Sequence, residues 1–544
     1  MSDVIDVGKI ADQLGVPPDC LLPYGRRVAK IHLDALKRPS SGAGKLVLVS
    51  ATTPTPAGEG KTTTSIGLAQ ALAKLGASVC LALREASLGP CLGMKGGATG
   101  GGRSSLVPAE RINLHFTGDF HAVTSANNLL SAIIDNHIYH GNALGIDPRR
   151  VVWRRVMDMN DRSLRHIIVG LGGTGRGIPR EGGFDITAAS EVMAMLCLAE
   201  DSEDLRRRID RTLVAYRWDG EPVYAGELQV TGAMLALLRD AIHPNLVQTS
   251  EGVPALVHGG PFANIAHGCS SLIATRMAIH FADWAITEAG FGFDLGAEKF
   301  FDIKCRLSGL DPVAVVLVTT VRALKMHGGQ PPGKSGVKNI AALRRGLVNL
   351  DKHIENVGKF NKRPVVALNH FAGDSEQEIA LVVKRCKEQG VACAVCRHFE
   401  QGGAGAVELA RAVMDAAAVS EPFAPLYPLE LPVEEKIRVI CREIYGADDV
   451  AFTRQAERDL RQVARLGLNQ LPVCVAKAPT SLSDNPALKG RPRDFDITVR
   501  AVQVNSGAGF LVVLTGDVLR MPGLPKAPLA ERIDLGADGR IEGL

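Results

Sequence analysis

The sequence predicts an α/β protein built around a parallel sheet. Two observations predict this fold class: short apolar, β-branched runs alternate with amphipathic helical stretches, and the runs are continuously apolar rather than alternating with polar residues. Continuous apolar runs are typical of parallel strands that are covered by helices on both faces. In chain order, we expect buried strands at 46–50, 78–83, 166–171, 313–318, 364–368 and 391–395.

Glycine- and proline-rich stretches divide the chain into three predicted units. Breaks are expected at Gly328–Gly336 and at Pro422–Pro432, where turn-forming residues gather. We therefore predict a large domain over 1–350, a smaller α/β domain over 351–425 and a C-terminal α/β domain over 426–544.

Composition excludes several classes of protein. With 46% hydrophobic and 22% charged residues, the 544-residue chain has an ordinary globular composition and is not wholly disordered. The net charge of +4 is spread along the chain, so we expect no nucleic-acid partner. No apolar run approaches the roughly 18–20 residues of a membrane helix, so we expect no membrane association. The 11 scattered cysteines and the absence of a signal pattern predict reduced thiols and a cytoplasmic location.

The sharpest local motif is a glycine-rich loop at 55–62 (TPAGEGKT), between the first predicted strand and a helix. This context is typical of a phosphate-binding loop, in which backbone N–H groups and the helix N-terminus face phosphate oxygens. Lys61 is expected to reach the β- and γ-phosphates of ATP, and the Thr62 hydroxyl to bind its magnesium ion. The loop departs from the usual pattern at Thr55, where glycine is common, and an ordinary glycine turn before a helix is the alternative.

The whole loop is predicted to surround ATP, and its members are Thr55, Pro56, Ala57, Gly58, Glu59, Gly60, Lys61 and Thr62. On this basis we predict a P-loop-containing nucleoside triphosphate hydrolase-like parallel sheet domain with additional smaller α/β domains. Gly328–Ser335 (GGQPPGKS) also fits the phosphate-loop pattern, but it lacks an adjacent strand and its two prolines remove N–H donors. Gly170–Gly175 (GLGGTG) fits a dinucleotide pattern without the helix that should follow.

A charged pair follows the second predicted strand. Ligands of open α/β sheets lie beyond the carboxyl ends of the strands, so Arg84 and Glu85 should lie beside the loop if the first two strands are neighbours. Arg84 could hold a small carboxylate or a phosphoryl group through its two-pronged guanidinium. Glu85 could bind magnesium or orient Arg84. A solvated charge pair at a strand end is the alternative.

Several long blocks of the sequence resemble the formate–tetrahydrofolate ligase family, and the resemblance covers nearly the whole chain. The blocks are Thr55–Thr64, Arg84–Gly97, Ile112–Tyr139, Arg149–Asp161, His258–Cys269, Thr287–Arg306 and Met521–Lys526. The resemblance implies an enzyme of one-carbon metabolism that ligates formate to tetrahydrofolate with ATP. It gives 10-formyltetrahydrofolate, ADP and phosphate through formyl phosphate.

The family resemblance also implies roles for individual residues. It assigns catalytic positions to Lys61, Arg84, Glu85 and Ser87, with Lys61 and Arg84 neutralising phosphoryl and formyl oxygens and the other two lining the pocket of the intermediate. Magnesium accompanies ATP at Thr62, and a monovalent cation activates the family. The resemblance further implies a homotetramer.

The folate site is where the sequence departs from the family. By resemblance, the folate-binding residues are Phe291, Gly296, Phe371, Ala372 and Phe399. Phe399 replaces a usual tryptophan, Ala372 a usual proline, and Ala478–Thr480 a stretch that commonly contains tyrosine. Phe293 replaces a small alanine and could crowd the pocket. Three interpretations stay open: a ligase with neutral drift, a paralogue with an altered formyl acceptor, and a P-loop nucleotide-binding switch or scaffold.

Overall fold

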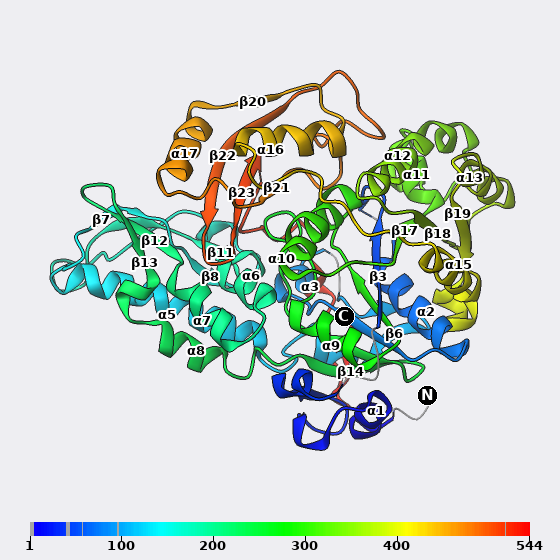
Figure 1. The fold of residues 1–544 in the computed structure, drawn as a ribbon, viewed down its shortest axis with the longest axis horizontal. Coiled ribbons are helices and arrows are strands. Elements are labelled where there is room, and N and C mark those ends of the chain that lie inside the picture. The colour runs from blue at the N-terminus through cyan, green and yellow to red at the C-terminus, as the bar shows by residue number, and fades with distance from the viewer. Residues whose placement is uncertain (1–4, 40–43, 57, 95–96, 517, 544) are drawn as a thin grey trace.

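A single large sheet runs through the protein (Figure 1), and a computed structural model describes residues 5–39, 44–56, 58–94, 97–516 and 518–543. The sheet has twelve strands in the order β1-β2-β14-β15-β4-β16-β3-β17-β18-β19, with β6 attached to β14 and β5 to β6. These strands are β1 (Leu21–Pro23), β2 (Ala29–Ile31), β3 (Lys45–Ala51), β4 (Val79–Leu83), β5 (Gly100–Gly101), β6 (Ser104–Val107), β14 (Asn245–Thr249), β15 (Pro254–Val257), β16 (Trp284–Glu288), β17 (Ala314–Thr319), β18 (Pro364–Asn369) and β19 (Ala392–Cys396).

The central part of this sheet is parallel, from β15 through β4, β16, β3, β17 and β18 to β19. On the other side, β14, β2 and β1 continue the sheet with antiparallel pairing. The predicted α/β class is therefore confirmed. The predicted strands at 46–50, 78–83, 313–318, 364–368 and 391–395 are found as β3, β4, β17, β18 and β19.

Helices cover both faces of the parallel strands. Alternate side chains of β3 enter two separate apolar clusters, Val47 and Val49 in one, and Leu46 and Leu48 in the other. The first cluster includes α2 (Lys61–Lys74) and α15 (Val407–Ala418), which lie together in Figure 1, and the second includes α9 (Leu272–Phe281) and α12 (Ile340–Gly358). Because both faces are buried, the strand is continuously apolar over 46–49 instead of alternating with polar residues.

The expected buried strand at 166–171 is wrong. Residues Ile167–Val169 form β9, which pairs antiparallel with β10 (Arg180–Gly182) in a two-stranded hairpin. The side chain of Ile168 is 64% exposed. A short apolar run indicates an extended backbone, but its burial depends on helices and strands specified elsewhere in the chain, and in the described structure β9 and β10 pair only with each other.

Two further groups of elements surround the central sheet. One lies at the left of Figure 1 and contains β7 (Ile146–Val151), β12 (Leu213–Arg217), β13 (Pro222–Tyr224), β8 (Arg155–Met157), β11 (Phe184–Ile186), α5 (Asp119–Tyr139), α6 (Glu191–Leu198), α7 (Ser202–Asp210) and α8 (Thr231–Leu238). The other, at the top, is a four-stranded sheet in the order β20-β22-β23-β21 with two helices: β20 (Val450–Phe452), β21 (Val473–Ala476), β22 (Ile497–Asn505), β23 (Phe510–Thr515), α16 (Val433–Ile440) and α17 (Arg454–Arg465).

These groupings bear on the predicted division of the chain. The strands of the 351–425 segment, β18 and β19, extend the same sheet as the N-terminal segment, whereas the C-terminal segment builds the separate four-stranded sheet. The exact domain limits stay a prediction.

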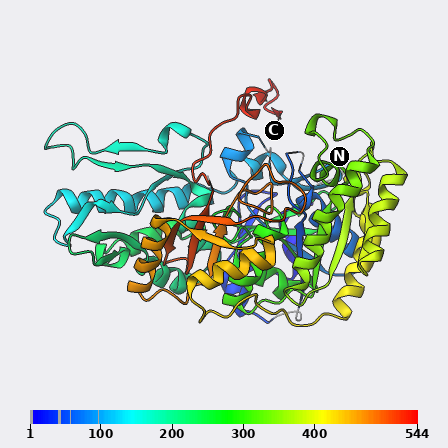
Figure 2. The same ribbon diagram turned by 90° about the horizontal axis from the view of Figure 1, so that it is seen from above.

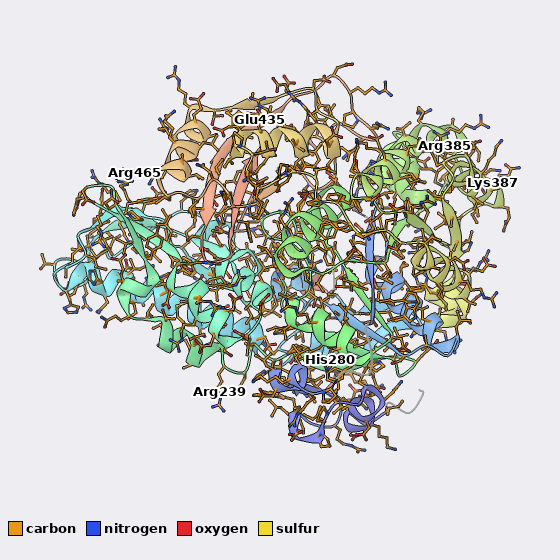
Figure 3. The ribbon with its side chains drawn as sticks, in the orientation of Figure 1. Arg239, His280, Arg385, Lys387, Glu435 and Arg465 are labelled. Carbon is orange, nitrogen blue, oxygen red and sulfur yellow. The ribbon has the colours of Figure 1, made fainter. Side chains whose placement is uncertain are left out.

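The last residues, drawn in red, project from the body in Figure 2, and exposed charged side chains such as Lys387 and Arg465 lie on the rim in Figure 3. None of the described helices is both long and apolar enough to span a membrane.

Candidate active site

The residues predicted to act on ligands gather at the carboxyl edge of the parallel strands. Because parallel strands end at the same edge, residues that follow them in different parts of the chain become neighbours. Across this edge, the strands are followed or ended by Arg84 (β4), Glu288 (β16), the loop 55–60 (β3), Arg322 (β17), Phe371 (β18) and Phe399 (β19). Arg84 is expected beside the loop if the first two predicted strands, β3 and β4, are neighbours. They are not, because β16 lies between them and pairs with both.

The glycine-rich loop is braced by its own residues and by β18. The Glu59 carboxylate accepts hydrogen bonds from the backbone N–H of Thr55 at 2.6 Å and from its hydroxyl at 3.0 Å. The Gly58 N–H donates to the Thr55 carbonyl at 3.0 Å, so this donor closes the loop instead of facing a ligand. Gly60 has a φ of +77° and is the N-cap of α2, and the Asn369 amide donates to the Glu59 carbonyl at 3.1 Å. Ala57 lies outside the described residues.

The first turn of α2 meets the end of β16. The hydroxyl of Thr62 donates to the Glu288 carboxylate at 2.9 Å, across 226 residues of sequence. Among the described residues, no group of three or more His, Cys, Asp or Glu side chains could hold a metal ion. One hydroxyl and one carboxylate nevertheless suit magnesium, which usually takes few protein ligands and completes its octahedron with phosphates and water. Sequence reasoning missed Glu288, although the apolar run at 284–286, followed two residues later by a carboxylate, was a usable signal.

Lys61 lies among charges of both signs. Burial lowers the pKa of its ammonium group, while the nearby carboxylates of Glu59 and Glu288 raise it and Arg84 lowers it further. Arg84 is therefore close enough to Lys61 to repel it, despite the strand between β3 and β4. Two cations whose charges act on each other at one sheet edge are suited to bind an anion there.

The Arg84 guanidinium is held against the backbone of the neighbouring loops. Its Nη1 donates to the Pro261 carbonyl at 3.0 Å, and its buried Nε has no hydrogen-bond partner among the described residues. A Cβ atom on Gly290 would lie 2.9 Å from Nη2, so the guanidinium packs directly on this glycine. The side chain thus keeps one buried donor for a ligand.

Glu85 and Ser87 belong to a second group of polar residues beside Arg84. Glu85 is 5% exposed, and burial together with the Asp119 and Asp158 carboxylates raises the pKa of its carboxyl well above the ordinary value. No hydrogen bond or ion pair joins Glu85 to Arg84 in the described part of the chain, so the alternative in which Glu85 orients Arg84 is not observed. The Ser87 hydroxyl donates to Asp158 at 2.6 Å, and burial raises the pKa of Asp158 to about 6.

The two aromatic residues predicted to contact folate follow adjacent strands. Asn369 and Cys396, near the ends of β18 and β19, are partners in the strand register. Phe371 is half-buried and Phe399 is 54% exposed, with Ala372 exposed beside Phe371. The Phe399 ring packs over a glycine turn, because a Cβ on Gly101 would lie 3.1 Å from its Cε2 atom.

The segment that follows β16 turns sharply and then enters a π-helix. Phe291 has a φ of +57°, which is unfavourable for a non-glycine residue. Gly296 is buried, and a Cβ there would collide with the Gly290 backbone, so packing alone requires this glycine. The idea that Phe293 crowds the pocket is wrong, because its ring is fully buried with those of Phe301 and Phe360 in the core.

The substituted segment Ala478–Thr480 is tied to this same region. Lys477, at the end of β21, forms a fully buried ion pair with Asp294 at 2.7 Å.

The two weaker glycine motifs lie elsewhere. Gly328–Ser335 follows α11 (Val321–His327) rather than a strand, and Gly170–Gly175 lies in the turn between β9 and β10, with no helix after it.

Comparisons with known proteins agree on one family. A family model described as "Formate--tetrahydrofolate ligase" matches residues 2–544. The formate--tetrahydrofolate ligase of Paracoccus denitrificans (strain Pd 1222) is 56% identical over 544 residues, covering 99% of this chain and 98% of that protein. The formate--tetrahydrofolate ligase of Methylobacterium sp. (strain 4-46) is 56% identical over 542 residues, covering 99% of this chain and 97% of that protein.

Proposed function

The chain belongs to the formate–tetrahydrofolate ligase family, and from this premise we propose which of its residues carry each step of the reaction. The family's reaction is the ATP-dependent ligation of formate to tetrahydrofolate in one-carbon metabolism. The observation that carries the assignment is the convergence of Lys61, Arg84 and Glu288 at one edge of the sheet.

In the first step, the loop 55–62 holds ATP in the manner of a P-loop nucleoside triphosphate hydrolase. The N–H groups of the first turn of α2 face the phosphates, and Lys61 neutralises the γ-phosphate. Thr62 and Glu288 would hold magnesium, which would neutralise charge on the β- and γ-phosphates. The Glu59 side chain has a different task, since it braces Thr55 and keeps the loop in shape.

Formate and ATP repel each other, so the formation of formyl phosphate needs cations between them. A formate oxygen attacks the γ-phosphorus, the bond to the β–γ bridging oxygen breaks, and ADP leaves. Arg84 holds the formate and the transferred phosphoryl group, using the donor that no described residue occupies. Glu85 and Ser87 line this pocket. Burial raises the pKa of the Glu85 carboxyl, which favours its neutral form near the two anions, where a charged carboxylate would repel them.

In the second step, N10 of tetrahydrofolate attacks the formyl carbon, phosphate leaves and the N10 proton is lost. The pterin ring lies between Phe371 and Phe399, with Ala372, Phe291 and Gly296 nearby. Strands in a sheet are about 4.8 Å apart, so β18 is roughly 10 Å from the strand that carries the loop. This spacing suits a ligand whose ring stacks at β18 and whose N10 extends toward the loop.

The protein's environment and assembly complete the proposal. We propose that the enzyme is a cytoplasmic homotetramer that is stimulated by a monovalent cation. Light scattering in solution tests the assembly, and assays in potassium, ammonium and bulky organic-cation buffers test the stimulation. A monomer, or equal rates in all three buffers, would contradict the corresponding statement.

A coupled assay that detects ADP tests the function and separates it from its alternatives. The ligase should release ADP only with formate, and tetrahydrofolate should stimulate the release strongly. A paralogue with another acceptor would form formyl phosphate with little response to tetrahydrofolate. A switch or scaffold would hydrolyse ATP without formate. In the same assay, Lys61→Ala should abolish turnover, and near-normal activity would reject the loop assignment.

A further inference from the structure

Arg322 is an arginine for which the reaction described above gives no role. It is the second residue of α11, which follows β17 at the same sheet edge as the loop 55–62 and Phe371. Its buried Nε has no hydrogen-bond partner, and no ion pair to its guanidinium is found within the described residues. The guanidinium is half-buried, and its charge acts on the nearby Asp374 carboxyl, yet no ion pair holds it in the described part of the chain. Its position is therefore set by another contact.

The contact that Arg322 does make is with an aromatic ring. Its guanidinium carbon lies 4.3 Å from the centre of the Phe371 ring, within the range of a cation–π contact. One face of Phe371 is therefore covered by protein. A flat ligand that stacks on Phe371 must use the opposite face.

The backbone of Phe371 is fixed independently of this contact. Its N–H donates to the Asp374 carboxylate at 2.9 Å, and its carbonyl accepts from the Asp374 N–H at 2.9 Å. This reciprocal pair fixes where the side chain starts but not how the ring is turned. Arg322 lies in the first turn of α11. The N-terminus of this helix is capped by the Thr320 hydroxyl, which accepts a hydrogen bond from the Ala323 N–H at 2.9 Å.

We propose that Arg322 is a positioning residue for the acceptor: its guanidinium clamps one face of Phe371 so that the pterin of tetrahydrofolate stacks on the other. This inference rests on the proposed function and deepens it. Arg322 does not touch the reacting atoms. It determines the orientation of the ring that receives the pterin, and the planar fork is better suited to this than an ammonium group.

The test replaces Arg322 by methionine, which has similar length but neither charge nor plane. Arg322→Met should raise the KM and the Kd for tetrahydrofolate about fivefold to tenfold and leave the KM for ATP within about twofold. The Kd of Arg322→Lys for tetrahydrofolate should lie between those of the parent and of Arg322→Met, because lysine keeps the positive charge and lacks the planar guanidinium. Arg344→Met, at an exposed position of α12, is the matched control and should change neither constant.

A double-mutant cycle separates positioning from general damage. In a Phe371→Leu background the ring is absent, so Arg322→Met should have little further effect on the Kd for tetrahydrofolate. Full additivity, or an equal rise in the KM for ATP, would overturn the proposal. If Arg322→Met does not fold, the same cycle with Arg322→Lys decides the question.

A glutamate-free analogue distinguishes the proposal from direct binding of the folate tail. Tetrahydropteroate keeps the pterin and lacks the glutamate, so it should lose affinity for Arg322→Met as much as tetrahydrofolate does. Loss with tetrahydrofolate alone would mean that Arg322 binds a carboxylate, and the proposal would be wrong. Failure of the proposed function is recognised separately, because the unmodified protein would then show no turnover stimulated by tetrahydrofolate.

Discussion

Replacing Gly60 by alanine tests the proposal that the loop 55–62 binds ATP, and that it does so only with Gly60 in the backbone conformation seen here. Gly60 has a φ of +77°, where an alanine costs about 1 kcal/mol. The added Cβ would also collide with the Asn369 amide, which donates to the Glu59 carbonyl at 3.1 Å. Losing that hydrogen bond costs about 1 kcal/mol, and relieving the collision costs more.

The three costs together are about 2–3 kcal/mol, which corresponds to a roughly 30- to 150-fold weaker binding of ATP. The measurement is the Kd for ATP by calorimetry, with the KM for ATP from the coupled assay and the thermal unfolding midpoint of each variant. Gly58→Ala is the matched control. Its φ of +74° imposes the same backbone cost, but no described atom lies within 4 Å of the added Cβ, so about a fivefold loss is expected.

A second variant identifies the collision itself. Asn369→Ala alone removes the hydrogen bond and should weaken ATP binding by about fivefold. Combined with Gly60→Ala, it should cause no further loss and should recover part of the affinity, because removing the amide also removes the collision. The reasoning is refuted if the two effects multiply, or if Gly60→Ala and Gly58→Ala weaken ATP binding equally.

Three further predictions concern the metal, the formate site and pH. Glu288→Gln should raise the magnesium concentration needed for half-maximal activity about tenfold or more, measured by titration of the assay, whereas Thr62→Ser, which keeps the hydroxyl, should change it little. Gly290→Ala should lower kcat about tenfold to a hundredfold, because its Cβ would lie 2.7 Å from the Cβ of Ala263 and 2.9 Å from Nη2 of Arg84, and the guanidinium is the more easily displaced of the two. Burial raises the pKa of Glu191 from 4.5 to about 7, so the free energy of unfolding should fall as pH rises through this window. Glu191→Gln should not show this fall. By pH 7 its free energy of unfolding, measured with urea, should have risen by about 3 kcal/mol relative to that of the parent protein.

Each of these predictions has an outcome that contradicts it. An unchanged magnesium requirement in Glu288→Gln would remove this carboxylate from the metal site. A normal kcat with a raised KM for ATP in Gly290→Ala would show that Arg84 had not moved relative to formate. Parallel pH profiles of the parent and Glu191→Gln would mean that this carboxyl does not change its ionisation over the window.

The fold and the site were predictable from sequence to different extents. The strand, loop and helix around Gly60 are contiguous in the chain, and their apolar periodicity and glycine spacing are local properties. The run at 166–171 has the same local composition but ends as an exposed hairpin, because burial depends on which helices pack over a strand. The roles expected for Phe371 and Phe399 came from the family resemblance, and no local pattern predicts that they follow adjacent strands.

The sequence by itself determined that a glycine-rich loop joins a buried strand to a helix, because a few neighbouring residues set backbone conformation there. Only the tertiary structure decided what surrounds that loop. Glu288 reaches Thr62 across 226 residues, and Asn369 reaches Glu59 across 310. The order of the strands selects these partners, and that order follows from the packing of every helix and strand at once, which no short stretch of sequence specifies.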